Sequence, residues 1–504
     1  MMPDVRITRL HKRYRLPAIA TDERSRLDRV LASAMRNELL DAALARAGVR
    51  SDDLICVRRV ESTIRLDRSN SDWQLGVVWS VALADAVAAR VQEAGPDVVR
   101  YRSRHFAIAD MACSAAAGVL ERAWAWRSLG IWRAGDAMAA TTAPAEVVRI
   151  LADDARVAPA VLCEVARRGL LPLLVTSAAD DRWTALARAV LVDSGASASS
   201  IHRLLFDDDP GAGAGDESPS AIAGTSRLRA RSPLLRALNG VAWGEPAAAA
   251  VRLRALAVLA MMEREPALAI LPDAAAVVRA LAQLPAAGSD VRAERDGAAR
   301  RAERSVASDS RTLDDTAVAP EPAVEETDTA PVGDAGRTQG VTLVGGLPFL
   351  LHTVGSLGLP GALVNEPALA ARSLRWTLHQ LALMIAPIAP DDPAALAFAG
   401  LPPGAAPPCA GEPPSTDDEQ ALLRSTCGPI VAALRQRLGS SGDESDADLL
   451  YRIVARRAEV VADPAWIEIR FAADSVSIDV RRAGLDLDPG WLPWLGVVVR
   501  FAYV

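Results

Sequence analysis

Residues 464–504 read PAWIEIRFAADSVSIDVRRAGLDLDPGWLPWLGVVVRFAYV, and this stretch decides the class of fold that we expect. From Trp466 to Phe471 apolar and charged residues alternate, which is the pattern of a strand with one buried face. Residues 476–480 repeat the alternation after a short connection, so the two runs predict a hairpin. Val497 to Tyr503 is apolar enough for a third strand inside a sheet. The stretch therefore predicts a small terminal β-sheet.

The segment between these strands carries turn residues and two tryptophans. Asp488, Pro489 and Gly490 are typical of a turn, because proline fixes φ and glycine accepts a positive φ. Trp491 and Trp494 follow three residues apart and offer a large apolar surface, while the prolines beside them disfavour a helix. We expect these two rings to contact a partner protein.

The composition favours helices in the rest of the chain. Half of the 504 residues are apolar, but only 4% are aromatic, so we expect cores built by helix packing. The length allows two to four domains. The predicted fold class is α+β, predominantly α-helical, with small terminal β-sheet elements and a long disordered linker.

Patterns along the chain divide it into four expected parts. Alternating runs at Val5–Leu16 and Leu54–Leu66, each followed by an amphipathic helix, predict an N-terminal α+β module. Ser71 and Asp72 are expected to cap the second of these helices. Short amphipathic helices follow, including residues 144–153, 158–168, 182–191 and 247–262, and then comes an acidic stretch in which residues 314–334 contain seven acids and no base.

Three further helices are expected after the acidic stretch. The first covers residues 370–385, and the last covers residues 445–461 and leads into the terminal sheet. The helix between them begins at a capping box formed by Thr416 and Glu419, and Pro429 should interrupt it. The predicted boundaries are 1–140 for the α+β module, 141–284 for the helical middle region, 285–340 for the disordered acidic linker, and 341–504 for a C-terminal helical domain ending in the small β-sheet.

Charge and residue usage exclude several classes of function. The net charge of -7 and the pI near 5.5 argue against a nucleic-acid partner, which would require a basic surface. The one lysine, Lys12, follows His11 and not glycine, so a phosphate-binding loop and a lysine Schiff base are both disfavoured.

We expect a cytoplasmic protein without a membrane span. The five cysteines are widely spaced, which is typical of free thiols in a reducing compartment. The opening residues are charged and alternating, so they do not resemble a secretory signal. The longest uncharged run, residues 338–365, is interrupted by glycines and two prolines, which favours a buried loop and a short helix over a spanning helix.

The sequence predicts no cofactor and no metal site. The five histidines lack ligand spacing, and no HExxH or GxSxG motif occurs. The acidic loop 207–217 lacks the residue order of a calcium-binding loop, so its ligand, if any, stays open. Asp486 and Asp488 form the best carboxylate pair for general acid/base chemistry, although Asp488 before Pro-Gly is also typical of a turn.

Five segments of the chain resemble the tape measure protein family of bacterial extracellular contractile injection systems, which are phage-tail-like particles. The segments are VRITRLHKRYRLP, LICVRRVESTIRL, GLPFLLHTVGSLGLP, LRWTLHQLALMIAP and DVRRAGLDLDPGWLPWLGVVVRF. The resemblance implies a non-enzymatic role in assembling the inner tube or setting its length within a contractile sheath. The many prolines and glycines disfavour one long ruler helix, so a cap or a chaperone-like component is also open.

These observations give one main hypothesis and two alternatives. The main one is a structural or assembly component that binds tube, sheath or cap subunits, and the residues expected to bind these partners are Trp124, Trp126, Trp376, Trp491 and Trp494. The first alternative is a hydrolase that uses Asp486 and Asp488 or a Cys/His site assembled in space. The second is an α-helical adaptor that recruits cargo through its middle region.

Overall fold

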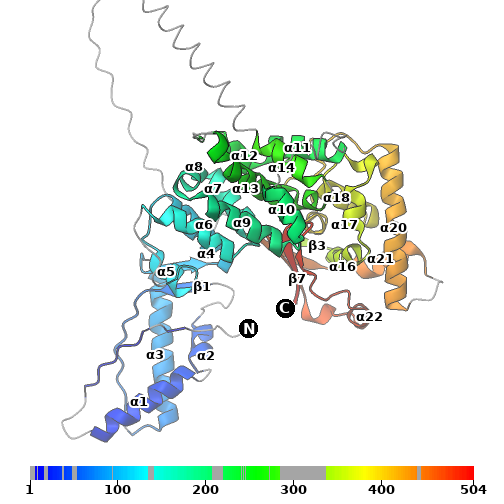
Figure 1. The fold of residues 1–504 in the computed structure, drawn as a ribbon. Coiled ribbons are helices and arrows are strands. Elements are labelled where there is room, and N and C mark those ends of the chain that lie inside the picture. The colour runs from blue at the N-terminus through cyan, green and yellow to red at the C-terminus, as the bar shows by residue number, and fades with distance from the viewer. Residues whose placement is uncertain are drawn as a thin grey trace, which may run out of the picture. The chain divides into compact units, whose positions relative to one another are not determined.

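A computed structural model of the chain describes residues 6–7, 9–15, 21–36, 39–47, 54–67, 69–93, 95–133, 141–206, 219–239, 241, 243, 246–271, 273–283, 337–439 and 444–504. Most of the described residues are helical, with a small β-sheet near the C-terminus, so the predicted α+β class is confirmed (Figure 1). Contacts divide the chain into two compact units. One comprises Met1–Met111 and Val119–Met138, and the other comprises Ala112–Gly118 and Ala139–Val504.

The first unit is a small helical body with one two-stranded antiparallel sheet, β1 with β2. Its elements, with α4 ending in the second unit, are α1 (Thr21–Arg36), α2 (Leu39–Arg46), β1 (Leu54–Val57), α3 (Asp72–Glu93), β2 (Val98–Tyr101), α4 (Arg104–Ala116) and α5 (Ala123–Ser128). Ser71 begins α3 as predicted, because its hydroxyl accepts a hydrogen bond from the Gln74 backbone N–H.

Two strand predictions in this unit are wrong. The described residues between Arg6 and Arg15 form no strand, and the second predicted strand ends at Val57 and not at Leu66. Arg59 and Glu61 pair with each other in exposed backbone, where alternation alone does not supply a neighbouring strand. The partner of β1 is β2, which the sequence analysis did not identify.

The core of the first unit contains a buried polar group. Asp110 is 1% exposed and accepts hydrogen bonds from Tyr101 Oη at 2.7 Å and Trp126 Nε1 at 3.1 Å. Arg122 reaches the other carboxylate oxygen at 2.8 Å. Trp126 also stacks on Trp132, with ring centroids 6.0 Å apart. Buried charge is tolerated here because each carboxylate oxygen is paired.

The second unit begins with packed helices, and the predicted helices at residues 144–153, 158–168, 182–191 and 247–262 are confirmed. Its elements before the acidic stretch are α6 (Ala143–Asp153), α7 (Ala158–Arg167), α8 (Leu171–Ser177), α9 (Asp180–Asp193), α10 (Ala198–Phe206), α11 (Pro219–Arg231), α12 (Pro233–Leu238), α13 (Pro246–Arg264), η2 (Pro266–Ile270) and α14 (Ala274–Ala282). Leu256, Val258 and Leu259 of α13 are at most 1% exposed, which places this helix in the core.

The rest of the second unit carries short helices and the sheet. The elements are β3 (Thr338–Thr342), η3 (Leu347–Phe349), α16 (Leu350–Ser356), α17 (Leu359–Val364), η4 (Pro367–Leu369), α18 (Leu374–Ile385), α19 (Pro393–Phe398), α20 (Asp417–Leu438), α21 (Asp446–Val454), β4 (Ala458–Asp463), β5 (Trp466–Phe471), η5 (Ala473–Ser475), α22 (Ile478–Arg482), β6 (Gly490–Leu492) and β7 (Val497–Tyr503).

The five-stranded sheet has the order β3-β4-β5-β7-β6. Its strands pair antiparallel except for β5 and β7, which run parallel with Trp466 opposite Val498. One face is the core face, because Ile467, Ile469 and Phe471 of β5 are all at most 2% exposed. The predicted strands at Trp466–Phe471 and Val497–Tyr503 are confirmed.

The predicted hairpin is wrong. Residues 473–475 and 478–482 form η5 and the short helix α22, and β5 pairs instead with β4 and β7. Only Val480 of the apolar alternation is buried, whereas Val476 and Ile478 are exposed. A strand at this position would have needed three buried residues on one face, and the structure buries one.

Other predicted boundaries also change. The last helix was expected to reach Val461, but α21 ends at Val454 and β4 begins at Ala458. Pro429 was expected to interrupt α20, yet the helix continues through it. Ser425, whose carbonyl loses its partner at Pro429, is exposed on the helix surface, so water can satisfy that oxygen.

The predicted division of residues 141–504 into separate parts differs from the structure. The helical region 141–284 and residues 341–504 belong to one compact unit, joined for example by Arg227 Nη1 and the Ala370 carbonyl oxygen. Thr338–Gly340, expected in the linker, belong to β3. The remainder of the expected linker up to residue 336 lies outside the described residues.

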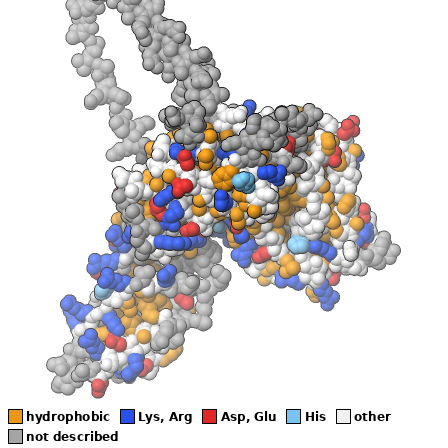
Figure 2. All heavy atoms as spheres, viewed as in Figure 1, with side chains coloured by type: hydrophobic (Ala, Val, Ile, Leu, Met, Phe, Trp, Pro, Cys, Tyr) orange, Lys and Arg blue, Asp and Glu red, His pale blue; other side chains and the backbone are white. Residues whose placement is uncertain are grey.

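Among the described helices, α3 alone has the length and apolar composition that would suffice to cross a membrane, and 22% of its most apolar window is buried inside the protein. Residues 338–365 instead form β3, η3, α16 and α17. In the face of the molecule that Figure 2 shows, charged side chains of both signs are interspersed with apolar ones.

Candidate functional site

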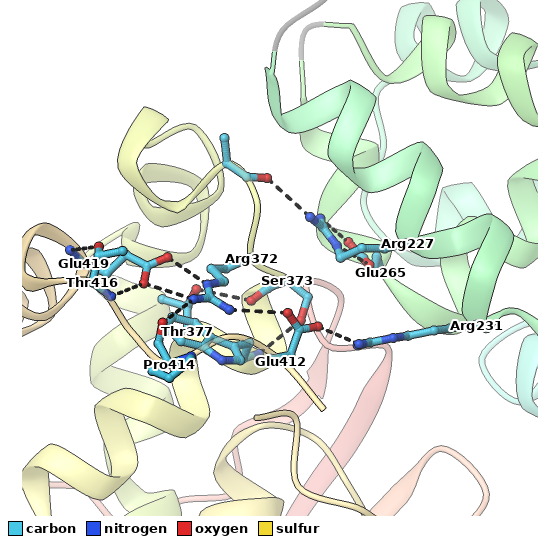
Figure 3. A network of polar contacts seen from close by, with 12 residues as sticks. Arg227, Arg231, Glu265, Arg372, Ser373, Thr377, Glu412, Pro414, Thr416 and Glu419 are labelled. Atoms are coloured by element: carbon cyan, nitrogen blue, oxygen red, sulfur yellow. Dashed lines mark hydrogen bonds and ion pairs between the residues drawn. The ribbon is translucent and has the colours of Figure 1, made fainter. Parts of the chain in front are cut away.

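A network of arginines and glutamates connects the middle helices of the second unit to its C-terminal elements (Figure 3). Arg372, just before α18, donates to Glu419 of α20 through Nε at 2.7 Å and through Nη2 at 3.2 Å. Its Nη1 reaches Glu412 at 3.3 Å, and Glu412 in turn accepts from Arg231 of α11 at 2.6 Å. Such two-point arginine–carboxylate contacts fix orientation as well as distance.

Local capping explains why Glu419 lies in this position. Thr416 and Glu419 form the predicted capping box, in which Glu419 Oε2 accepts from the Thr416 backbone N–H at 2.7 Å. Burial is the largest single influence and raises the pKa of Glu419, but the hydrogen bonds from Arg372 and Thr416 and the charge of Arg372 together outweigh it and hold the pKa below its usual value. Glu419 is therefore a charged anchor for Arg372.

A second ion pair lies beside the first. Arg227 of α11 donates to Glu265 through Nε at 2.8 Å and Nη2 at 2.7 Å, and each side chain is 12% exposed. Glu265 lies immediately before η2. The two pairs therefore lie on two walls of one hollow between α11, η2 and the beginning of α18.

That hollow is the arginine pocket, lined by Arg227, Arg264, Arg372 and Arg375, by Ser373 and Thr377 at the beginning of α18, and by Trp494 among others. The empty space of this pocket is about 430 Å³ when its solvent-open part is included. The cavity space available to a water-sized group is about 20 Å³. Glu265 is the only carboxylate among its lining residues, so its walls are predominantly positive.

Arg375 differs from the other three arginines because no carboxylate of the described residues lies within ion-pair distance of it. Its Nη2 donates to the Leu495 carbonyl oxygen at 2.9 Å and its Nη1 to that of Gly400 at 3.4 Å. Its Nε is buried and has no hydrogen-bond partner among the described residues. The guanidinium is enclosed by protein, although the whole residue keeps intermediate exposure, and burial lowers its pKa to about 10.

The carboxyl group that acts most strongly on Arg375 is that of Glu263 of α13, and its environment limits its value as a counter-ion. Burial raises the pKa of Glu263, and the nearby Arg264 and Arg375 only partly oppose that rise. Glu263 Oε2 lies 3.8 Å from Arg264 Nε. A carboxyl that resists ionisation compensates a buried guanidinium poorly.

The structure separates the five tryptophans predicted to bind partners. Trp126 is 0% and Trp376 is 2% exposed, so both are core residues, and neither ring can contact a partner while the surrounding helices remain packed. Trp376 lies under the Arg372 guanidinium, 4.3 Å from it. Trp124, Trp491 and Trp494 are half-buried, and for these three a partner contact stays a prediction.

Trp491 and Trp494 have different surroundings. Trp491 is part of the edge strand β6, and Arg156 lies over its ring at 5.8 Å. Trp494 lies beyond β6 and lines the arginine pocket. Trp494 is thus the only one of the five predicted residues that belongs to that pocket.

Asp486 and Asp488 do not share a site in the structure. Asp486 is 6% exposed and accepts from Tyr503 Oη at 2.9 Å and from Arg481 at 2.8 Å. Asp488 accepts from the Phe501 backbone N–H at 2.7 Å and pairs with Arg500 at 3.2 Å. Both carboxylates therefore attach the terminal segment to β7, which corresponds to the structural interpretation of this pair.

Burial makes two of the cysteines and one of the histidines poorly suited to the Cys/His nucleophile pair that the hydrolase alternative requires. Burial raises the pKa of the Cys56 thiol to about 11 and that of Cys163 to about 12. His379 is 0% exposed, and its Nε2 lies 2.7 Å from the Pro390 carbonyl oxygen. No group of three or more His, Cys, Asp or Glu among the described residues could hold a metal ion, and the acidic loop 207–217 lies outside them.

Compared with known proteins, the chain matches no family model, no curated protein and no solved structure.

Sequence reasoning missed the arginine pocket. The predicted helix began at Ala370, whereas α18 begins at Leu374 with Ser373 as its N-cap, and the Ser373 hydroxyl accepts from the Trp376 N–H at 3.1 Å. With that start, Arg372 and Arg375 flank a helix N-terminus that carries no acid in its first turn. This charge order is opposite to the usual one and was the available signal.

Proposed function

We propose that this chain is a non-enzymatic assembly protein of a phage-tail-like contractile injection system that binds other protein subunits of the particle. The family resemblance of its terminal segment suggests the particle. The argument for a binding protein is the commitment of the candidate reactive groups, Asp486, Asp488, Cys163 and His379, to packing and internal contacts.

The observation that carries the proposal is the position of the terminal segment at the sheet edge. β6 is an edge strand, and half-buried Trp491 and Trp494 lie on it and directly after it. Large amphipathic rings with part of their surface exposed are typical of the residues that dominate protein interfaces. We infer that this edge contacts a tube, sheath or cap subunit.

The test is capture of defined subunits. The tagged full chain is co-expressed with the tube and sheath subunits of a contractile injection system, and bound subunits are quantified by mass spectrometry for the wild type, Trp491→Ala and Trp494→Ala. Loss of an interface hot spot of about 2 kcal/mol or more predicts at least about a tenfold weaker capture. The matched control is Trp73→Ala, which removes a ring that is 69% exposed in the first unit.

If both terminal variants have the circular dichroism spectrum of the wild type and still capture the subunits equally well, the assigned contact surface is contradicted. Absence of any subunit in the wild-type capture would contradict the particle assignment itself. If an alanine variant unfolds, Trp494→Tyr replaces it, because tyrosine keeps most of the aromatic ring. Normal capture by Trp494→Tyr at wild-type stability would also count against the contact.

A further inference from the structure

The beginning of α18 carries an excess of positive charge that the carboxylates nearby neutralise only in part. Unpaired N–H groups at a helix N-terminus already present partial positive charge, so acidic residues are favoured there and cations are not. The N-terminus of α18 nevertheless carries Arg372 and Arg375 and no acid in its first turn. Arg372 is neutralised by Glu419 and Glu412, which leaves Arg375.

Arg375 is a second, independent observation at the same place. The Arg375 guanidinium donates hydrogen bonds only to two backbone carbonyl oxygens, and Glu263 and Glu265 act on it without forming an ion pair with it, so burial still lowers its pKa. Its buried Nε has no acceptor among the described residues, so one of its donors remains unused. Uncompensated buried charge of this kind is costly unless an anion accompanies it.

The arginine pocket lies where such an anion would be held. Arg264, Arg375, Ser373 and Thr377 all line it, so two guanidinium groups and two hydroxyl side chains border the same cavity. The cavity space of about 20 Å³ accommodates one group the size of a water molecule, such as a single charged oxygen, and the group that carries this oxygen would extend toward the solvent. Helix N-termini with nearby arginines are favourable oxyanion sites.

We propose that the arginine pocket at the N-terminus of α18 binds an oxyanion, a carboxylate or a phosphate group, which pairs with Arg375 and Arg264. The anion neutralises the charge that Arg375 brings into the interior and locks α18 against α11 and η2. The assignment does not rest on the proposed assembly role; because Trp494 also lines the pocket, its test leaves both terminal tryptophans unchanged.

The experiment measures the melting temperature of the full chain against increasing inorganic phosphate, and separately against acetate, at constant ionic strength. A ligand that binds only the folded state raises the melting temperature, and the rise follows occupancy of the site. Removing one charged hydrogen-bond donor predicts about a ten- to hundred-fold weaker apparent affinity in Arg375→Gln and in Arg264→Gln. The control is Arg482→Gln, an exposed arginine outside the pocket that removes the same charge.

A saturable rise in the wild type and in Arg482→Gln, lost in both pocket variants, supports the proposal. A rise with phosphate alone identifies a phosphate group as the ligand, and one with acetate alone identifies a carboxylate such as an acidic side chain supplies. An equal response of all four proteins is a general salt effect and overturns the proposal, as does no response to either anion. If Arg375→Gln unfolds, Arg264→Gln alone decides.

Discussion

Arg372 and Glu419 form a two-point ion pair in which each side chain is only 6% exposed, so the charged link between the beginning of α18 and the first turn of α20 is buried. We expect Glu419→Gln to lower the free energy of unfolding by about 3 kcal/mol, because it leaves a buried guanidinium with a weakened partner. Urea denaturation followed by circular dichroism measures this change.

Glu412→Gln is the matched control for that prediction. Glu412 also contacts Arg372, but at 3.3 Å, and its other partner Arg231 is 44% exposed. We expect this variant to cost about 1 kcal/mol or less. If Glu419→Gln and Glu412→Gln lower the free energy of unfolding equally, burial of the Arg372–Glu419 pair does not determine its strength.

His379 predicts a pH-dependent stability. Burial lowers the pKa of His379 below its usual 6.5, and the contact with the Pro390 carbonyl oxygen only partly opposes this. The folded state therefore favours the neutral ring, so its contribution is fully present above pH 6.5 and is lost as the pH falls from 6.5 through the folded-state pKa. Each unit of pKa depression corresponds to about 1.4 kcal/mol.

The measurement compares urea midpoints at pH 7.5 and pH 5.5. His379→Gln keeps a donor for Pro390 but does not titrate in this range, so its loss of stability on acidification should be smaller than that of the wild type. His352→Gln changes an exposed histidine that contacts Arg437 and should behave as the wild type. Identical acid losses in all three proteins would exclude His379 as the cause.

Thiol reactivity should follow burial. The pKa values of Cys56 and Cys163 are about 11 and about 12, whereas an ordinary thiol has a pKa of 9.0. Both side chains are buried, and each carries at least about a hundredfold less thiolate than an ordinary thiol. We expect iodoacetamide at pH 7.5 to label half-buried Cys409 first, as read by peptide mass spectrometry. In urea all five cysteines should react at similar rates; rapid labelling of Cys163 in the folded protein would instead favour the Cys/His alternative.

Asp486→Asn and Asp488→Asn test the hydrolase alternative through stability. Asp486 is buried against Tyr503 and Arg481, so its replacement should cost about 1.5–3 kcal/mol. Asp488 is exposed, and its replacement should cost about 1 kcal/mol. Calorimetric melting of the two variants measures both values. Wild-type stability combined with loss of a hydrolytic activity would contradict the structural role given to these residues here.

The sequence predicted those elements whose pattern has one interpretation. Trp466–Phe471 alternates over six residues, and the amphipathic helices of the middle region repeat their apolar positions over at least two turns. β4 was missed because its central residues Val460 and Val461 are both buried, so the strand shows no alternation and continues the helical pattern of α21. β3 contains only one large apolar residue, Val341, so its sequence resembles that of a linker and did not predict a strand.

The site depended on information that is not local. Arg372, Glu412 and Arg231 come from three distant segments, and their meeting follows from packing of the middle helices on the C-terminal elements. The burial of Trp376 could not be predicted for the same reason, because the apolar pattern of a helix does not show which of its sides a neighbouring element covers. The unfavourable charge order at the beginning of α18 was the one local indication.

β7 pairs with β5 on one side and with β6 on the other. Because β5 and β7 run parallel, the chain between them has to return to the other end of the sheet before β7 can form, and it does so through η5, α22 and β6. Displacement of β7 would therefore leave unpaired backbone groups on β5 and on β6 at once. Two newly exposed strand edges are templates for pairing with another chain, so self-association would accompany the loss of this single strand.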